Sequence, residues 1–444
     1  MAGVILRKKS TPHGVSIPES KPTAGKPIET LPPTKKAIVP LHQHLGVPCE
    51  PLVKKGDIVK TGEKIGDSES YVSAPIHSPL SGEVTGFTKV IGPTTGRLTD
   101  AIIITADGRD IWEETEAAKD VEALSPDEIV ALVREAGIVG LGGATFPSHV
   151  KLSPPKDRKI DTLILNGCEC EPYITSDHRV MLEYGEKVLL GLSLSKKVFN
   201  PDRIYIAIED NKQDAIDHLE ALITEMGMDR HVSIVPLKSK YPMGGEKILI
   251  KVITGREVPS GGLPLDVGVV VQSISTVKAM YDAVFEGKPL IERVITVTGL
   301  VERQGNLCVR FGTPLREVID YCGGMKKNAN EILLGGPMMG TSYFDLDSPV
   351  TKGINCILVK ESTPVKEENC IRCGRCLDAC TMDLIPTNFV KYVKNHDYAA
   401  CKKASITDCI ECGACAYSCP SHIPIVEYIK IAKGELVNKK RIKK

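Results

Sequence analysis

Apolar residues in the middle of the chain follow two different periodicities in turn. Short apolar runs at 162–165, 203–208 and 232–235 have the length of buried strands. Near 176–191 and 212–226, apolar residues recur at the spacing of one helix face. Strands that alternate with helices in this way predict a parallel sheet covered by helices.

A well-marked helix start precedes this region. Ser125 can cap the helix, Pro126 suits its first position, and Glu128 completes a capping box with Ser125. Apolar residues within 129–133 form the buried face, and Gly137 marks the end. We therefore expect a helix from about 126 to 136 at the entrance to the α/β region.

The N-terminal part of the chain has a different pattern. Residues 1–36 are rich in proline and lysine and predict an extended arm that lies on other domains. Residues 37–110 show short strands between glycine turns, a pattern that resembles the barrel-sandwich fold of biotinyl and lipoyl domains. The hairpin that holds the modified lysine in those domains reads Ser68-Glu69-Ser70 here, so we expect a structural barrel.

After the α/β region, the pattern resembles a small β-grasp module of the soluble-ligand-binding type. Strands are predicted at 293–299 and 307–310, followed by a helix near 314–321 and a pair of glycines. We expect this module to pack near the functional site, and we assign it no chemistry.

Composition and charge narrow the class of protein. Lysine plus arginine and aspartate plus glutamate each number 56, so the formal net charge is zero. A nucleic-acid binder usually has a basic excess, and we expect no nucleic-acid partner. The start of the chain lacks the pattern of a secretory signal, and no apolar stretch approaches the roughly 20 residues that span a bilayer. We expect a protein that meets a membrane only through partners.

The cysteines give the strongest chemical signal. The chain has 15 of them, and two runs share the spacing C-x2-C-x2-C-x3-C. In two-cluster ferredoxin modules, three cysteines of a run bind one [4Fe–4S] cluster and the fourth binds the other cluster. This spacing predicts one cluster on Cys370, Cys373, Cys376 and Cys419, and a second on Cys409, Cys412, Cys415 and Cys380.

Zinc and disulfides are the alternatives for these cysteines. A zinc site needs only four ligands, and two identical runs of four are unusual for it. Between the runs, residues 387–404 have helical periodicity and predict one inserted helix of about 18 residues. Cys401 lies at the end of this segment and is expected to be buried and unreactive.

Two loops in the α/β region differ from ordinary turns. The first, 140–147, reads GLGGATFP, and its glycines would let a ligand approach the backbone closely. The second, 166–173, reads NGCECEPY and follows a strand, where open α/β sheets bind ligands. On spacing alone, the first could equally be a tight turn, and the second could hold surface carboxylates with Cys168 and Cys170 as small filling residues.

These loops acquire a specific meaning in combination. With Lys151 and the later segment YPMGGEK, they resemble the flavin and nicotinamide site of the NADH-oxidising subunit of respiratory complex I. More closely, the chain is similar to the RnfC family, a component of the Rnf complex, over roughly residues 10–435. That resemblance includes HGVSIPESK and VPLHQHLG near the start, and the order barrel, α/β, β-grasp, ferredoxin.

The resemblance implies a set of cofactor-binding residues and no separate catalytic residue. The glycine loop would lie against FMN, the loop from Asn166 would contact flavin and nicotinamide, and Ser275 and Thr276 would close over the FMN phosphate. In full, the implied residues are Gly140, Gly142, Gly143, Ala144, Phe146, Lys151, Asn166, Glu169, Glu171, Tyr241, Gly244, Gly245, Glu246, Ser275 and Thr276. Gly245 and Lys247 depart from complex I, where an acidic residue and a threonine are usual.

The implied fold is multidomain α/β and α+β. Its expected parts are an arm (1–36), a barrel-sandwich domain (37–115), an FMN-binding α/β domain (120–288), a β-grasp module (289–345) and a two-cluster ferredoxin domain (360–435). The resemblance implies FMN, two [4Fe–4S] clusters and NAD(H) as substrate.

The implied function is that of an oxidoreductase subunit of an ion-translocating complex. It would exchange electrons between NAD(H) and ferredoxin through membrane-embedded and ferredoxin-like partner subunits, on the cytoplasmic side of the inner or plasma membrane. The alternatives are a cobalamin reductase of a microcompartment and a non-catalytic iron–sulfur electron wire.

Overall fold

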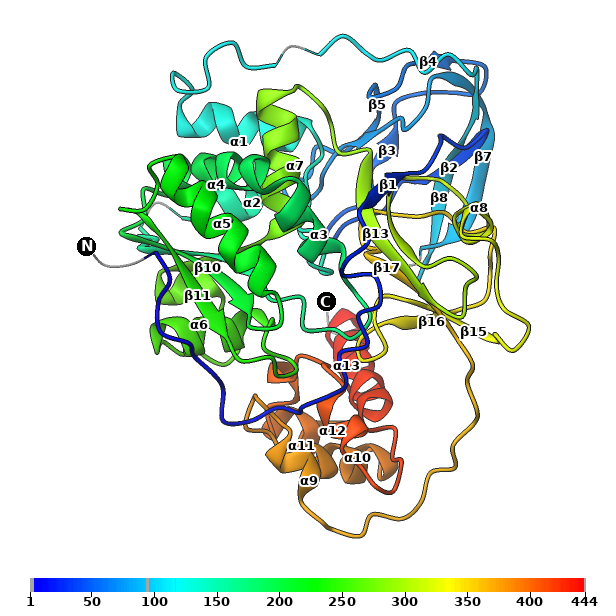
Figure 1. Ribbon diagram of the computed structural model, residues 1–444. Helices are drawn as coiled ribbons and strands as arrows, with labels where there is room; N and C mark the ends of the chain where they lie inside the picture. The colour runs from blue at the N-terminus through cyan, green and yellow to red at the C-terminus, as the bar shows by residue number, and fades with distance from the viewer. Residues whose placement is uncertain (1–3, 93–95, 116, 156, 443–444) are drawn as a thin grey trace.

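The computed structural model describes residues 4–92, 96–115, 117–155 and 157–442. Figure 1 shows the arrangement: an α/β domain in green, a barrel in blue, a β-grasp sheet in yellow and a ferredoxin domain in orange and red. The ferredoxin domain lies below the α/β domain and the β-grasp sheet and beside both. Among the described helices, none combines the length and the apolar character needed to cross a bilayer.

The α/β domain contains the predicted parallel sheet. Its strand order is β11-β10-β9-β12, and every neighbouring pair is parallel. Leu163 and Leu165 pack into one apolar core and Ile164 into another, so β9 is buried on both faces. The strands are β9 (Thr162–Gly167), β10 (Arg203–Glu209), β11 (Val232–Leu237) and β12 (Val269–Ser273).

Helices cover both faces of this sheet. The predicted capping box begins α1, where Glu128 N donates to Ser125 Oγ at 3.3 Å and Ser125 N donates to Glu128 Oε2 at 2.7 Å. The helices are α1 (Pro126–Glu135), α2 (Ser148–Leu152), α3 (Ser176–Glu183), α4 (Gly185–Phe199), α5 (Gln213–Glu225), α6 (Glu246–Thr254) and α7 (Ile274–Phe285), with a 3₁₀ turn at Pro264–Val267.

The prediction of one helix over 176–191 was wrong. Tyr184 leaves the helical conformation and separates α3 from α4. The break brings Gly185 against α5, where a Cβ at Gly185 would lie only 2.7 Å from Leu222 Cδ1. Tertiary packing therefore decides this break, and the local periodicity does not reveal it.

The barrel consists of two small antiparallel sheets around one apolar core. The hairpin that would hold a carrier lysine is docked against α1, because Arg134 donates to Ser68 O at 3.0 Å and to both carboxylate oxygens of Asp67. The first sheet has β2 (Lys36–Pro40), β8 (Leu98–Ala106), β7 (Gly82–Ile91) and β4 (Ile58–Val59), and the second has β3 (Glu50–Pro51), β5 (Lys64–Asp67) and β6 (Ile76–His77).

The β-grasp sheet is larger than the predicted module. Strand β17 lies between β13 and β15, although it begins after the expected end at residue 345. The sheet order is β1 (Ile28–Thr30), β14 (Gly305–Arg310), β13 (Glu292–Gly299), β17 (Cys356–Lys360), β15 (Glu331–Leu334) and β16 (Thr341–Tyr343), with α8 (Leu315–Tyr321) following β14.

The N-terminal arm is extended and contacts three other parts of the molecule. Leu6 N donates to Ile234 O at 2.8 Å and Lys9 N to Pro236 O at 3.0 Å, so the arm extends the sheet at β11. Further on, it passes the ferredoxin domain and joins the β-grasp sheet as β1 (dark blue in Figure 1).

The ferredoxin domain packs short helices around a small core that includes Cys401, which is fully buried as predicted. The single inserted helix predicted over 387–404 was wrong. His396 has a left-handed φ of 54°, and the Asp397 side chain caps a new helix at Ala400 N. The helices are α9 (Arg375–Asp378), α10 (Pro386–Lys394), α11 (Tyr398–Lys403), α12 (Ala414–Tyr417) and α13 (Ile425–Ile442), with a 3₁₀ turn at Ile406–Asp408.

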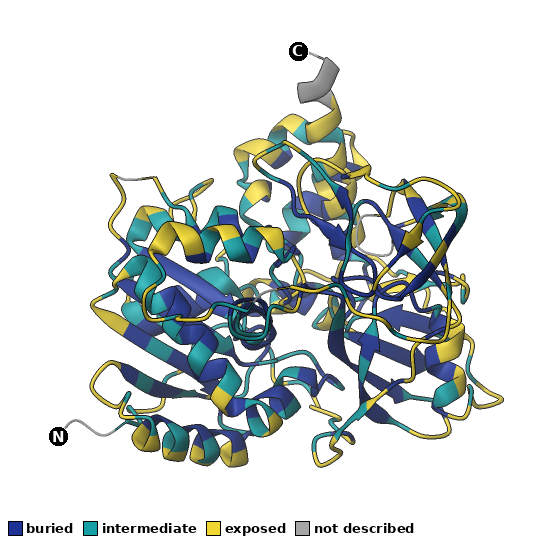
Figure 2. Ribbon diagram, turned by 90° about the horizontal axis from the view of Figure 1, so that it is seen from above, coloured by how far each residue is buried: buried dark blue, intermediate teal, exposed yellow. Residues whose placement is uncertain are grey.

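Burial follows this arrangement. Figure 2 shows buried strands inside the two large units and exposed outer faces on the surrounding helices. Helices α4 and α7 pack closely because Gly191 faces α7, where a Cβ would lie 1.9 Å from Val277 O. Gly434 on α13 has no such neighbour, since no heavy atom lies within 4 Å of its Cβ position.

These two helical glycines give a matched pair of substitutions. Gly191→Ala should lower the free energy of unfolding by about 1–3 kcal/mol, because α4 and α7 must separate. Gly434→Ala should raise it by about 0.5–1 kcal/mol, because alanine is the better helix former. Chemical denaturation of both variants checks this, and equal stability of Gly191→Ala and the wild type would contradict the packing.

Candidate functional site

The glycine loop lies between α1 and α2. Gly140 N donates to Phe146 O at 2.8 Å, and Thr145 N donates to Gly140 O at 3.1 Å, which closes the loop. Gly142, Gly143 and Ala144 are exposed at its tip. Gly143 has φ of 113°, a conformation that favours glycine, and no atom lies within 4 Å of its Cβ position. The tip therefore offers an open stretch of backbone to a ligand.

The loop is fixed against the N-terminus of α7. Leu141 N donates to Thr276 Oγ1 at 2.9 Å, and Thr276 Oγ1 is 2.7 Å from Ser273 Oγ. A Cβ at Gly142 would lie 3.3 Å from Ser273 Cβ, so a larger residue would crowd this contact. The N-terminus of a helix carries partial positive charge and free N–H groups, which suit a phosphate.

Arg293 supports the glycine loop from the β-grasp side. Its guanidinium donates to Leu141 O at 3.0 Å and to Lys352 O, and it is buried. Burial lowers the pKa of Arg293 to about 10. We did not predict this role, because an isolated arginine in a strand carries no signal in the sequence.

Ser275 makes a different contact from its neighbour. Its hydroxyl donates to Asp177 Oδ1 at 2.5 Å, which joins the first turns of α7 and α3. Burial, and then the nearby Glu169 carboxylate, raise the pKa of Asp177. The implied contact of Ser275 with a phosphate stays a prediction.

Asn166 connects three of the implied segments. It is paired in register with Ser273 of β12, beside the glycine loop. Its Nδ2 donates to Gly244 O at 2.9 Å, and its Oδ1 accepts from Cys168 N at 3.2 Å. A Cβ at Gly244 would lie 3.3 Å from both Cys168 Cβ and Cys170 Sγ, so these small side chains allow the loops to pack closely.

Glu169 caps α3. Its Oε1 accepts from Asp177 N at 2.6 Å and its Oε2 accepts from His178 N at 3.2 Å. Its own φ is 48°, in the left-handed region. The carboxylate is therefore engaged by a helix N-terminus, and its implied contact with nicotinamide stays a prediction.

Glu171 contacts the β-grasp module. Its carboxylate accepts from Met338 N at 3.2 Å and from Met339 N at 2.8 Å, in the loop between β15 and β16. A Cβ at Gly336 would lie 2.2 Å from Glu171 Oε2, so this loop needs glycine there. Burial raises the pKa of Glu171 to about 7. The expectation that the module packs near the site is confirmed, and its contact is this loop.

Tyr241 joins the α/β domain to the ferredoxin domain. It is 2% exposed, and its hydroxyl donates to Cys412 O at 2.6 Å. Next to this contact, a Cβ at Gly413 would lie 2.7 Å from Met338 O. The loops that contain Glu171, Tyr241, Met338 and Cys412 thus meet at one place, which we call the junction.

The remaining implied residues lie on the other side of the loop of Tyr241. Lys151 Nζ on α2 is 2.6 Å from Glu246 Oε1 at the start of α6, and both side chains are partly exposed. Phe146 is partly buried between the glycine loop and α2. A Cβ at Gly245 would lie 2.9 Å from Ile248 Cδ1, so the acidic residue usual in complex I would require Ile248 to move.

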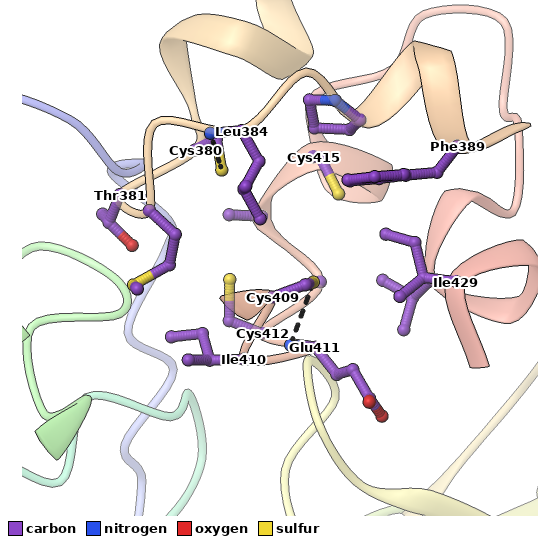
Figure 3. Close-up of a pocket in the computed structure, with 15 residues that line it drawn as sticks. Cys380, Thr381, Leu384, Phe389, Cys409, Ile410, Glu411, Cys412, Cys415 and Ile429 are labelled. Carbon is purple, nitrogen blue, oxygen red and sulfur yellow. Dashed lines mark hydrogen bonds between the residues drawn. The ribbon is translucent and has the colours of Figure 1, made fainter. Parts of the chain in front are cut away.

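The cysteines form two separate quartets. Cys380, Cys409, Cys412 and Cys415 line one cavity, and Figure 3 shows their sulfur atoms directed toward the same space. Leu384 N donates to Cys380 Sγ and Glu411 N to Cys409 Sγ, each at 3.4 Å (dashed lines in Figure 3). We call this the inner quartet, because Cys412 belongs to the junction.

The second quartet lies on the far side of the same domain. Cys370, Cys373, Cys376 and Cys419 line a second cavity, and Cys370 and Cys373 are exposed. We call this the outer quartet. Each quartet takes three cysteines from one run and the fourth from the other, which is the grouping expected from the spacing. That these cysteines bind iron stays a prediction.

The chemistry of the inner quartet fits a metal cluster. Burial raises the pKa of Cys412 to about 11 and that of Cys415 still further. Thiols in this position ionise only when a strong positive charge is bound among them, and cluster iron supplies that charge.

The fold and these sites define a class of electron-transfer protein: an iron–sulfur flavoprotein with a complex I-like α/β domain. Its four folded parts each match a known family. Residues 9–109 match the RnfC barrel sandwich hybrid domain, 133–282 the Nuo51 FMN-binding domain, 294–342 the SLBB domain and 369–423 the 4Fe-4S dicluster domain.

Two curated relatives match nearly the whole chain. The C subunit of the proton-translocating ferredoxin:NAD(+) oxidoreductase complex of Clostridium ljungdahlii is 46% identical, over 96% of this chain and 94% of the relative. The corresponding C subunit of the Na(+)-translocating complex of Acetobacterium woodii is 42% identical, over 94% and 95%. The chain therefore belongs to the RnfC family, the C subunits of ion-translocating oxidoreductase complexes.

A solved structure has a similar fold. The chain of an NAD+-reducing [NiFe]-hydrogenase in the H2-reduced state matches with a TM-score of 0.51 and 17% identity. The match covers 72% of this chain and 67% of that chain. At this identity the likeness shows the fold alone, and it agrees with the predicted combination of domains.

The raised pKa of Glu171 predicts a pH dependence of stability. Its folded pKa of about 7 lies above the ordinary value of 4.5, so the folded protein keeps this proton to higher pH than the unfolded chain does. As pH rises through this interval, the free energy of unfolding of the wild type should fall by about 1–3 kcal/mol more than that of Glu171→Gln. Denaturation curves from pH 4.5 to 8 measure this, and parallel curves would contradict it.

Proposed function

We propose that this chain is the NAD(H)-reacting subunit of an ion-translocating ferredoxin:NAD⁺ oxidoreductase complex. It exchanges electrons between NAD(H) and partner subunits, and through them with ferredoxin. The observation that supports this most strongly is the junction, where the loops of Glu171 and Tyr241 meet the inner quartet through Cys412. One chain thus places a candidate flavin site and a candidate cluster site in contact.

The residues present suit FMN in one position. The open backbone at Gly142 and Gly143 would lie against the flavin, and the N-terminus of α7 with Thr276 would hold the phosphate. The loops of Asn166 and Tyr241 border the same space and would orient nicotinamide. FMN supplies the chemistry that links a two-electron hydride donor to one-electron carriers.

The two quartets have different surroundings, and these suggest an order. The inner quartet adjoins the candidate flavin site through Tyr241 and Cys412, whereas the outer quartet includes the exposed Cys370 and Cys373. We therefore place the inner quartet between the flavin site and the outer quartet. Partner subunits would exchange electrons at the outer quartet, where exposure allows a close approach.

The membrane association belongs to the proposal as well. The two relatives are named as subunits of complexes that translocate protons in one case and Na⁺ in the other. We place this chain on the cytoplasmic face of such a complex, held by its membrane-embedded partners.

Cofactor analysis of the anaerobically purified chain tests the proposal. We expect about eight iron atoms in two [4Fe–4S] clusters, together with one FMN, and reduction of an artificial electron acceptor by NADH. Intact clusters with no FMN after reconstitution, and no NADH-driven dye reduction, would instead support a non-catalytic electron wire. Reduction of cobalamin at a comparable rate would support the cobalamin reductase alternative.

Three cysteine variants test the order of the clusters. Cys412→Ala should remove the inner cluster and prevent NADH from reducing the outer one, although dithionite still reduces it. Cys373→Ala should remove the outer cluster and leave the inner one reducible by NADH. Cys401→Ala is the matched control, because Cys401 is buried in the same domain outside both quartets.

Paramagnetic resonance of the reduced samples distinguishes the two clusters. The opposite pattern, in which Cys412→Ala still allows NADH to reduce the remaining cluster, would reverse the order. Loss of both clusters in Cys401→Ala would show that any substitution in this core disrupts the domain.

A further inference from the structure

The segment HGVSIPESK, residues 13–21, lies between the ferredoxin domain and the loop of Glu169 and Glu171. His13 Nδ1 is 3.3 Å from Asp378 O in the ferredoxin domain. Val15 exchanges two backbone hydrogen bonds with Tyr241, at 2.8 and 2.9 Å. The segment thus reaches the junction, and then it continues along the loop of Glu169 and Glu171 (dark blue in Figure 1).

Lys21 ends this segment and binds that loop directly. Its ammonium donates to Glu169 O at 2.8 Å, to Glu171 O at 3.1 Å and to Ile174 O at 2.6 Å. A lysine ammonium has three donors, and here three backbone carbonyls of one loop accept from it. The side chain is partly buried, and the contacts span roughly 150 positions in the sequence.

The residues beside Lys21 are fixed to the same loop. Tyr173 N donates to Glu19 O at 2.9 Å, and the hydroxyls of Thr23 and Thr175 are 2.6 Å apart. Thr23 is fully buried, and Asn306 of β14 donates to its carbonyl at 2.9 Å. The arm on both sides of Lys21 therefore cannot move without breaking buried hydrogen bonds.

The loop itself needs such support. Glu169 and Tyr173 have left-handed φ values of 48° and 70°, which are unfavourable for residues with a side chain. Such conformations persist where the surroundings hold them. Lys21 binds the carbonyls of Glu169 and Glu171 within this stretch.

Charge supports the same assignment. Burial lowers the pKa of Lys21, and the carboxylate of Glu169 opposes that change. Burial raises the pKa of Glu171 and of the buried Glu209, and the charge of Lys21 counteracts this at both. The ammonium therefore compensates negative charge beneath the candidate nicotinamide site.

We propose that Lys21 is a positioning residue of the redox site: it holds the loop of Glu169 and Glu171 in the conformation that receives nicotinamide. The N-terminal arm is thereby part of the site. This inference rests on the proposed function, and it adds a residue outside the α/β domain to it.

The test compares Lys21→Met with Lys26→Met in the full-length, anaerobically purified chain. Lys26 is the matched control, because it lies on the same arm, is exposed and donates only to Gln304 O among its described contacts. Without the ammonium, NADH binding must order the loop, and the affinity falls by that cost. Loss of about 1.4 kcal/mol corresponds to a tenfold change.

Per bound flavin, Lys21→Met should therefore raise KM for NADH about tenfold in dye reduction and change kcat by less than about threefold. Lys26→Met should match the wild type in both constants. Lys21→Met with an unchanged KM per flavin, even if its thermal stability falls, would show a structural role only and would overturn the inference.

Lys21→Arg and Lys21→Gln keep the test decisive if Lys21→Met does not fold. Lys21→Arg retains the charge and should have a KM closer to the wild type than Lys21→Gln does. Equal, wild-type KM values for both variants would overturn the inference. Absence of flavin and of NADH-driven dye reduction in the wild type would instead mean that the proposed function fails, which separates the two results.

Discussion

The contact between Tyr241 and Cys412 is the interaction on which the rest of the structure depends. It joins a buried side chain of the α/β domain to the backbone of a cysteine loop at 2.6 Å. Electron transfer between two carriers requires that they be held close together. The docking of the ferredoxin domain at this point therefore decides whether the candidate flavin site and the quartets can work as one unit.

Several close backbone approaches allow that docking. Gly413 lies against Met338 O and Gly336 lies against the Glu171 carboxylate, at distances that exclude a Cβ. Polar contacts at the edge add to it, such as Ser260 Oγ with Asp408 Oδ2 at 2.6 Å. Exposed ion pairs such as Lys251 with Asp383 contribute little by themselves. The N-terminal arm completes the contact, because it bonds to Tyr241 on one side and to the loop of Glu171 on the other.

The sequence predicted those features that have a local pattern. The parallel sheet follows from alternating periodicities, the start of α1 from Ser125 and Glu128, and the grouping of cysteines from their spacing within each run. The helix over 387–404 failed, because the left-handed residue His396 and the cap at Asp397 interrupt a pattern that is otherwise continuous. Strand β17 was missed, because its partners β13 and β15 are set by tertiary pairing.

Long-range contacts to backbone atoms could not be predicted. Lys21 and Arg293 act on carbonyl oxygens of distant loops, and a carbonyl oxygen leaves no trace in the residue types of its own segment. The loop of Met338 was missed for the same reason, since its N–H groups, and not its side chains, bind Glu171. Glu169 was predicted correctly as part of the loop, yet its carboxylate is used to cap α3, which only the spatial arrangement reveals.

A crystal structure of the anaerobic holoprotein, with data collected at the iron absorption edge, tests the central claim most directly. Two iron peaks should appear, one inside each quartet, with flavin density against Gly142 and Gly143. The peak beside Cys412 should be the nearer one to the flavin. Flavin density elsewhere, or a nearer iron peak in the quartet of Cys370 and Cys373, would contradict the account.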